Sequence, residues 1–341
     1  GNNTRNGVDK MKLDIKNDIV LLSHTDLDGY GSEIVLKAIG FEPTVKNLDN
    51  PEVDSYITEY VTKILNGETS APDVLFITDI GPKGEAVQKL DELNKSGKTK
   101  VKLFDHHATA LELNDYEWAR VIVEENGVMK CGTSLFYQFL KEETDIEIKE
   151  VIRVGLDTFV KEVELYDTWA WEEKNHESAK ILNDLFWLVG HKVFVDNQVQ
   201  KIKNGLETLF TPEEERLLEV EHRRIKKYLH DKNQDMVIID DFFTDDSGKP
   251  LTAGVVQADM YISELGHYLC DKNDIDFALM LNLTHDKASL RAVKEDINLV
   301  PIVKRYNGGG HQHAAGCQIT PMGMEFIQRI FNEIVKKQHL N

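Results

Sequence analysis

Acidic and histidine side chains follow three apolar, strand-like segments in the first third of this chain. The groups are His24, Asp26 and Asp28 after residues 18–23, Asp79 after residues 73–78, and Asp105, His106 and His107 after residues 100–104. Carboxylate oxygens and imidazole nitrogens are good ligands for divalent cations. Two such cations held close together are a common means of hydrolysing a phosphate ester. The residue types therefore predict a two-cation hydrolytic site, if the fold brings the three groups together.

The sequence between these groups predicts a fold that brings the three groups together. Residues 18–123 alternate short apolar runs with longer amphipathic stretches, which is typical of βαβ units and a parallel sheet. Loops after the carboxyl ends of parallel strands share one crevice, so the three groups are expected to meet there. The expected strands are 18–23, 43–48, 73–78, 100–104 and 118–123, and the expected helices are 31–40, 52–66 and 84–96.

The rest of the chain predicts a second lobe. Residues 132–228 have mostly helical periodicity, and strand-like runs return at 236–240, 276–283 and 288–293. We therefore predict an α/β protein with an N-terminal doubly wound, mainly parallel sheet and a smaller C-terminal α/β lobe, joined by a helical linker. The expected boundaries are a disordered leader or expression remnant at 1–10, a metal-binding catalytic domain at 11–204, the linker at 205–230 and a substrate-binding domain at 231–341.

A glycine-rich segment near the end of the chain is the second chemical signal. Gly308, Gly309 and Gly310 directly precede His311. Consecutive glycines allow backbone N–H groups to close on an anion, and the histidine adds a further donor. Arg291 carries a planar guanidinium that suits bidentate binding of phosphate or carboxylate. Together these residues predict that the second lobe binds phosphate.

Composition limits the partners of the chain. The formal net charge is −19, whereas a long nucleic-acid duplex needs a positive surface, so no long duplex is expected. No apolar run approaches the ~18 residues that span a bilayer, and residues 1–10 do not resemble a secretory signal, so no membrane is expected. The three cysteines are far apart, which favours a reduced, cytoplasmic protein. The sequence leaves open whether it is a monomer or a homodimer.

These motifs together resemble the DHH phosphoesterase family with its DHH-associated C-terminal domain, over nearly the whole chain. The amino-acid sequence of the first motif, residues 23–29, is most similar to that of the B-type nanoRNase branch. One departure concerns spacing, because only Thr25 separates His24 from Asp26, whereas several family members have three residues there. The resemblance rests on His24-Thr25-Asp26-Leu27-Asp28-Gly29, Asp79, Asp105-His106-His107 and Gly308-Gly309-Gly310-His311-Gln312-His313-Ala314-Ala315-Gly316.

The resemblance implies a site for two divalent cations, with Mn²⁺ expected and Mg²⁺ or Co²⁺ as alternatives. It also implies a catalytic acid or electrostatic stabiliser beside the scissile phosphate, and a second lobe that grips the far phosphate or terminal nucleotide. The implied roles are Asp79 for bridging both cations, His24 and Asp26 for completing one site, Asp28, His106 and a fourth-motif aspartate for completing the other, His107 for catalysis, and Arg291 with Gly308, Gly309, Gly310 and His311 for the substrate.

The fourth-motif aspartate has two candidates on helical sequence after the sheet. Asp167 is preferred for its polar and aromatic setting, and Asp157 is the alternative. Next to Asp167, the side chains of Trp169 and Trp171 have two interpretations, which are packing in the core and stacking on a base. The sequence leaves both interpretations open.

The implied activity is metal-dependent hydrolysis of short oligoribonucleotides from the 3′ end. Other substrates in the family are 3′-phosphoadenosine 5′-phosphate, cyclic dinucleotides and inorganic polyphosphate, so the partner is a short oligonucleotide or another small phosphate ester. An alternative hypothesis is that the protein is not an enzyme but a binding protein, which senses nucleotides with a catalytically idle site. The presence of every expected metal-ligand type disfavours that hypothesis.

Overall fold

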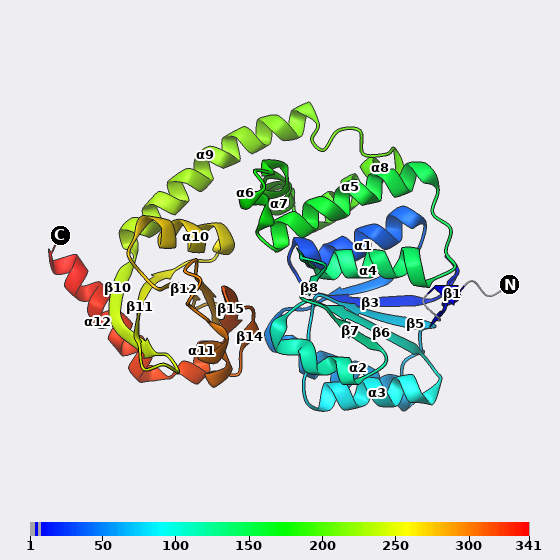
Figure 1. Ribbon diagram of the computed structural model, residues 1–341, viewed down its shortest axis with the longest axis horizontal. Helices are drawn as coiled ribbons and strands as arrows, with labels where there is room; N and C mark the ends of the chain where they lie inside the picture. Colours follow the sequence, from blue (N-terminus) through cyan, green and yellow to red (C-terminus); the bar gives the residue numbers. More distant parts are fainter. Residues whose placement is uncertain (1–3, 6–7, 341) are drawn as a thin grey trace. The chain divides into compact units, whose positions relative to one another are not determined.

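The computed structural model describes residues 4–5 and 8–340, and the chain divides into two compact units, residues 1–219 and 220–341 (Figure 1). We call these the first and second units. The division falls within helix α9 (Pro212–Asp235), inside the segment 205–230 for which a linker is predicted. The predicted leader, 1–10, lies partly outside the described residues, and its described part includes the paired strands β1 (Thr4–Arg5) and β2 (Val8–Asp9). The domain boundaries stay a prediction.

The first unit is built on a five-stranded parallel sheet with the strand order β4-β3-β5-β6-β7. Every residue of the central strand β5 is buried, as expected for a strand covered on both faces. Figure 1 shows helices on the two faces of this sheet, which confirms the predicted α/β class. The strands are β3 (Ile19–Ser23), β4 (Thr44–Asn47), β5 (Val74–Thr78), β6 (Lys100–Asp105) and β7 (Ala119–Val121).

Two hydrophobic cores fill the two faces of this sheet. Leu21 of β3 points into the core shared with α1 (Leu27–Ile39) and α4 (Gly132–Glu143). The next residue, Leu22, points into the core shared with α2 (Asn50–Leu65) and α3 (Glu85–Ser96). The connection after β3 therefore covers one face and the connection after β4 covers the other. Open α/β sheets bind ligands where the chain reverses in this way, outside the carboxyl ends of the strands.

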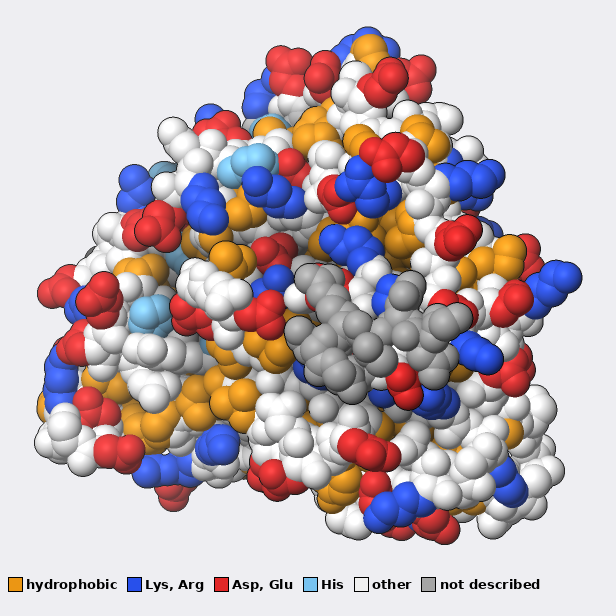
Figure 2. Space-filling model, turned by 45° about the vertical axis from the view of Figure 1, so that its right-hand side comes forward, with side chains coloured by type: hydrophobic (Ala, Val, Ile, Leu, Met, Phe, Trp, Pro, Cys, Tyr) orange, Lys and Arg blue, Asp and Glu red, His pale blue; other side chains and the backbone are white. Residues whose placement is uncertain are grey.

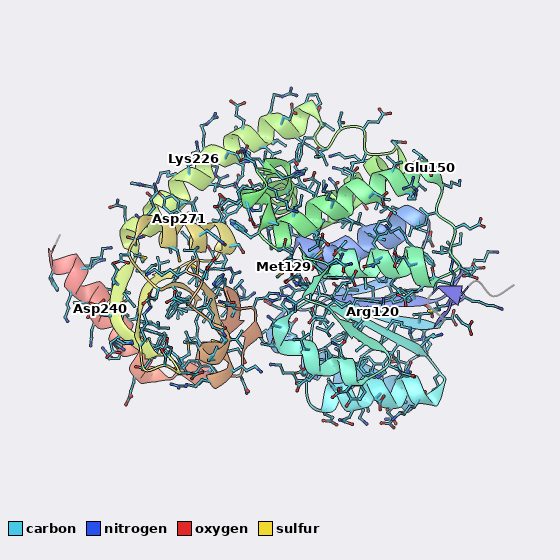
Figure 3. All side chains as sticks on the ribbon, viewed as in Figure 1. Arg120, Met129, Glu150, Lys226, Asp240 and Asp271 are labelled. Carbon is cyan, nitrogen blue, oxygen red and sulfur yellow. The ribbon has the colours of Figure 1, made fainter. Side chains whose placement is uncertain are left out.

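A hairpin and a group of helices complete the first unit. The hairpin, β8 with β9, was not predicted from the sequence, whereas the helical character of the following residues was. Figure 3 labels Met129 at the end of the hairpin and Glu150 at the start of α5. The elements are η1 (Ala108–Asp115), β8 (Glu124–Glu125), β9 (Val128–Met129), α5 (Glu150–Asp167), α6 (Ala170–Glu173), α7 (Glu177–Val189) and α8 (His191–Lys203).

The second unit contains a six-stranded mixed sheet with the order β10-β11-β12-β13-β15-β14, in which only β11 and β12 are parallel. The sequence patterns predicted β10, β12 and β13, and they missed β11, α10, β14 and β15. The elements are β10 (Val237–Thr244), β11 (Pro250–Gln257), α10 (Ile262–Lys272), β12 (Phe277–Asn282), β13 (Lys287–Arg291), α11 (Val300–Arg305), β14 (Gly309–Gly310), β15 (Ala314–Cys317), η2 (Thr320–Met322) and α12 (Met324–Leu340).

The charged side chains on the face shown in Figure 2 are of both signs. Lysines and arginines are interspersed there with aspartates and glutamates, and that face has no continuous basic track. Within the described part of the chain, no helix combines the length and the apolar composition needed to cross a membrane.

Candidate metal centre

The carboxyl ends of β3, β5 and β6 bring the acidic and histidine residues of the first unit together. Ligand atoms of His24, Asp26 and Asp79 lie within 4.8 Å of one another, and so do ligand atoms of Asp28, His106 and Asp167. Asp79 lies between the two groups. Its Oδ1 is 3.0 Å from His106 Nε2, and its Oδ2 is 3.9 Å from His24 Nδ1. One carboxylate therefore directs an oxygen to each group, as a residue shared by two cations would.

Asp28 is held by the start of helix α4. Its Oδ1 accepts a hydrogen bond of 2.8 Å from the Thr133 N–H, and its Oδ2 accepts one of 2.8 Å from the Gly132 N–H. The first N–H groups of a helix have no partner within the helix and attract negative charge. The same carboxylate lies 3.5 Å from His106 Nε2 through Oδ2. Asp28 is therefore fixed in place before any cation binds.

Asp79 has a backbone conformation that is rare outside glycine, with φ of 60°. This left-handed conformation costs roughly 1–2 kcal/mol for a residue with a side chain. Two contacts hold it in place. The Asp79 N–H donates to Phe104 O at 3.0 Å, and a Cβ on Gly132 would come within 2.9 Å of the Asp79 Cβ. The start of α4 therefore packs against Asp79 as closely as the absence of a side chain on Gly132 permits.

His24 has a carboxylate near each of its ring nitrogens. Nδ1 is 3.1 Å from Asp26 Oδ2, and Nε2 is 3.5 Å from Asp49 Oδ1. Histidines that bind metals commonly present their second N–H to a carboxylate, which fixes the tautomer. Asp49 is also the N-cap of α2, in a capping box with Glu52. The sequence patterns did not single out Asp49, because a cap followed by proline is an ordinary start of a helix.

His107 is oriented by Asp105, the last residue of β6. Asp105 is fully buried, and its Oδ1 lies 2.7 Å from His107 Nδ1. Burial alone would lower the pKa of His107, but the Asp105 charge and hydrogen bond outweigh it and raise that pKa. His107 therefore keeps a proton more readily than an isolated histidine, and Nε2 is the nitrogen directed away from Asp105. The sequence identified the Asp-His-His motif, but not this orienting role of its aspartate.

Burial, together with the crowding of carboxylates, determines the electrostatics of the centre. Burial raises the pKa values of the Asp79 and Asp167 carboxyls well above their usual range, and the neighbouring carboxylates raise both further. Burial alone would also raise the pKa of Asp26. The charge of His24 and its hydrogen bond to Asp26 outweigh burial, so the pKa of Asp26 is lowered. Burial, and then the charge of His107, lower the pKa of His106 to about 4. His106 is thus held as a neutral imidazole, the form that binds metal.

The residues present fit two divalent cations. Oδ2 of Asp79 is buried and accepts no hydrogen bond from the residues that the structure describes. A buried, unpaired carboxylate oxygen is costly unless a positive partner is present. The donor set of carboxylate oxygens and neutral imidazole nitrogens suits hard or borderline divalent ions. Cations of this kind would also relieve the mutual repulsion of the carboxylates.

The two candidates for the fourth-motif aspartate lie in different surroundings. Asp167 ends helix α5, and its Oδ2 lies 3.4 Å from His106 Nε2. Asp157 is instead engaged by its own surroundings, where it accepts hydrogen bonds from Tyr137 Oη at 2.6 Å and from Arg153 Nη1 at 2.9 Å. The fold thus brings Asp167 to the candidate metal centre, and it does not bring Asp157 there.

In the second unit, neighbouring strands hold the residues predicted to bind substrate. Arg291 of β13 is paired with Ala314 of β15, and β15 pairs with β14. The Arg291 guanidinium donates to Leu290 O at 2.9 Å and to Ser263 Oγ at 3.2 Å. A Cβ on Gly266 would lie 2.4 Å from Arg291 Cγ, so α10 approaches the arginine stem closely.

The glycines have a structural role in that arrangement. A Cβ on Gly308 would lie 2.2 Å from Gly316 O, and one on Gly310 would lie 2.6 Å from Ala314 O. The N–H groups of Gly308 and His311 already donate within the unit, to Val303 O and Ala314 O. The tight approach of β14 to β15 thus accounts for the glycines at 308 and 310 without a bound anion.

Comparison with known proteins identifies the family. Residues 18–160 match the DHH family, N-terminal domain, and residues 261–337 match the DHHA1 domain. The chain is 37% identical over 303 residues to oligoribonuclease NrnB of Bacillus subtilis (strain 168), covering 88% of this chain and 72% of that protein. This chain belongs to the DHH phosphoesterase family. DHH phosphoesterases use divalent cations, and the grouped acids and histidines are a candidate site for them.

More distant relatives include other phosphodiesterases. The chain is 22% identical over 353 residues to a 3′,5′-cyclic-nucleotide phosphodiesterase of Helicobacter pylori (strain ATCC 700392 / 26695), covering 93% of this chain and 97% of that protein. Among solved structures, the pGpG-specific phosphodiesterase PggH from a Vibrio is 13% identical with a TM-score of 0.48. That match covers 94% of this chain and 99% of that one.

Substitutions at Asp79 and Asp28 should change the stability of the metal-free protein in opposite directions. Asp79→Asn should raise the unfolding temperature in EDTA at slightly alkaline pH, because it removes a charge that its neighbours repel. Asp28→Asn should lower the unfolding temperature, with a loss of about 1–3 kcal/mol in the free energy of unfolding, because the amide nitrogen of asparagine cannot accept a hydrogen bond from an N–H group of α4. Differential scanning fluorimetry measures both, and a fall of similar size in the two variants would contradict this account of the centre.

Asp167→Asn should weaken Mn²⁺ binding at least about tenfold, because even outer partners of metal ligands affect affinity by that much. Asp157→Asn is the matched control, on the same helix and with the same loss of charge, and should bind Mn²⁺ like the unmodified protein. Isothermal titration calorimetry measures the affinity and the number of ions bound. Equal effects of the two substitutions would show that Asp167 acts only through its charge.

Asp49→Asn should weaken Mn²⁺ binding by about 10- to 100-fold without destabilising α2, because asparagine caps a helix as well as aspartate does. Glu52→Gln removes a charge from the same helical turn and should have little effect. In a His24→Ala background, Asp49→Asn should cause no further loss. A further loss there would mean that Asp49 acts independently of His24.

Proposed function

We propose that this protein is a Mn²⁺-dependent phosphohydrolase that removes nucleotides from the 3′ end of short oligoribonucleotides. The observation that carries the proposal is the convergence of two ligand groups on Asp79 at the carboxyl edge of the parallel sheet. Similarity to an oligoribonuclease over most of the chain supports the choice of substrate. Imidazole nitrogens among the donors favour Mn²⁺ over Mg²⁺, with Co²⁺ as a further alternative.

The proposed roles follow the geometry of the first unit. Two divalent cations, when bound, would activate a water molecule as the nucleophile and would neutralise charge on the phosphate. His24, Asp26 and Asp79 hold one cation, and Asp79 holds the second together with Asp28, His106 and Asp167. His107 has its Nδ1 engaged by Asp105, so Nε2 is the nitrogen that gives a proton to the leaving oxygen.

The second unit holds a part of the substrate that is not cut. Arg291 is suited to this role, because Ser263 and Leu290 already orient its guanidinium and Gly266 leaves room for its stem. A pre-oriented fork loses less freedom when it binds a phosphate. His311, on the segment that the glycines at 308 and 310 allow to pack against β15, adds a contact to the same phosphate or to the terminal nucleotide.

A second candidate substrate is a cyclic nucleotide or cyclic dinucleotide. It is favoured by the similarity, over nearly the full length of both proteins, to a 3′,5′-cyclic-nucleotide phosphodiesterase. The convergence of all the ligand types speaks against an idle nucleotide sensor. We also propose a cytoplasmic location, which is supported by the absence of disulfides among Cys131, Cys270 and Cys317.

A substrate comparison tests this proposal. With Mn²⁺, we expect turnover of RNA oligomers of two to five nucleotides to exceed turnover of cyclic dinucleotides, 3′-phosphoadenosine 5′-phosphate and polyphosphate. Turnover of a cyclic dinucleotide with no turnover of short RNA would replace the first candidate by the second. Nucleotide binding without any Mn²⁺-dependent turnover would instead identify a sensor.

Arg291→Ala should keep both cations and should still hydrolyse bis-p-nitrophenyl phosphate, because the metal ligands all lie in the first unit. It should lose most activity on short RNA, by roughly 10- to 100-fold in kcat/KM, as expected for one charged contact to phosphate. Arg329→Ala is a control that removes an arginine from the same unit. Equal loss of both activities in Arg291→Ala, or loss of neither, would contradict a substrate-gripping role.

A further inference from the structure

Two tryptophans beside Asp167 lie outside the hydrophobic cores. Trp169 and Trp171 are half-buried, and neither belongs to a core cluster of the described residues, although Tyr166 packs against the core of the first unit. Core packing was one of the two interpretations that the sequence left open for these side chains. Tryptophans outside a core are common at binding surfaces, because the indole combines a large apolar face with a polar N–H.

The rings form one aromatic cluster around the end of α5. The Tyr166 and Trp169 ring centroids are 5.7 Å apart, and those of Trp169 and Trp171 are 5.1 Å apart with an edge-to-face angle of 69°. Trp169 Nε1 donates a hydrogen bond of 2.8 Å to Glu172 Oε2, which restricts rotation of its ring. The cluster is therefore pre-arranged rather than a set of loose surface side chains.

The backbone at Trp169 is strained. Its φ of 61° and ψ of 13° are left-handed, a conformation that bulky residues rarely adopt. Strain of this kind concentrates at functional sites. A glycine would make the same turn between α5 and α6 more easily, so the presence of a tryptophan calls for a role of the ring itself. The turn begins two residues after Asp167, whose carboxylate lies 3.4 Å from His106.

Trp171 adds an unused hydrogen-bond donor. Its Nε1 is buried and donates to none of the residues that the structure describes. Buried indole N–H groups usually have an acceptor. An oxygen of a bound ligand is the kind of acceptor that this N–H lacks.

We propose that Trp169 and Trp171 form a platform on which a nucleobase of the substrate stacks beside the metal centre. This inference rests on the proposed function and narrows it to substrates that carry a base. Stacking on an aromatic ring tolerates any base, so the platform selects nucleotides without selecting their sequence. Inorganic polyphosphate has no base and gains nothing from it. These are positioning residues, because the reacting phosphate is left to the metal ligands and His107.

A base-dependent kinetic comparison tests the platform. The substrates are the RNA dinucleotide ApA and an analogue in which one residue is abasic. The unmodified protein should prefer ApA. Trp169→Leu and Trp171→Leu should each raise the KM for ApA about 10- to 100-fold, with kcat little changed. Neither variant should change for the abasic analogue. Trp169→Phe keeps a ring and should keep most of the preference.

Tryptophan fluorescence gives a second readout that needs no turnover. In EDTA, ApA should quench the fluorescence of the unmodified protein, and the quenching should fall in both leucine variants. Trp187→Leu is the matched control, because Trp187 is 54% exposed on α7 and is not part of the aromatic cluster around Trp169. It should lower total fluorescence and leave both the quenching and the KM for ApA unchanged.

The outcomes separate this inference from the proposed function. Equal losses on ApA and on the abasic analogue, or reduced Mn²⁺ binding in the leucine variants, would show a structural role and overturn the platform. Turnover of ApA that is unaffected by both substitutions would also overturn it, while leaving the proposed function standing. Base-dependent quenching without any turnover of ApA would support the platform and reject the oligoribonuclease proposal.

Discussion

The burial of several carboxylates at one edge of a sheet is the constraint on which the first unit depends. Asp28 and Asp79 are almost fully buried, and Asp26 and Asp167 lie close by. Such a cluster opposes folding, because each carboxylate loses water and repels its neighbours. It persists because the surrounding sheet and helices are stable enough to hold it. Cations bound at this edge would offset the repulsion, which is the physical reason to expect that the cluster binds them.

The start of α4 is the main structural answer to this constraint. Its N-terminal N–H groups neutralise part of the charge of Asp28, and Gly132 gives Asp79 the room for its left-handed backbone. These residues are more than a hundred positions from Asp28 in the sequence. A helix that follows the sheet in the sequence therefore completes an edge that three earlier strands begin. A change in α4 is expected to affect the metal centre before it affects the sheet.

The limits of prediction from the sequence follow the same physical lines. Local signals predicted the parallel strands and the residues at their ends, because a buried strand is a short apolar run and its polar successor stands out. The preference for Asp167 came from its local setting and from the resemblance. The pairing of Asp28 with α4, the position of Asp49 near His24 and the strained turn at Trp169 depend on packing between distant segments. Strand β11 was missed because Gly254 and flanking polar residues interrupt its apolar pattern.

A division of labour follows from the residue types. Cations held by carboxylates and imidazoles act on any accessible phosphate ester, so the metal centre sets the reaction and not the substrate. Choice among substrates has to come from groups that contact the rest of the molecule. In this chain the groups that we propose for this role are the aromatic platform at Trp169 and the pre-oriented guanidinium of Arg291. One recognises any base and the other any phosphate, so together they favour short nucleotides over other phosphate esters while leaving the base sequence unread.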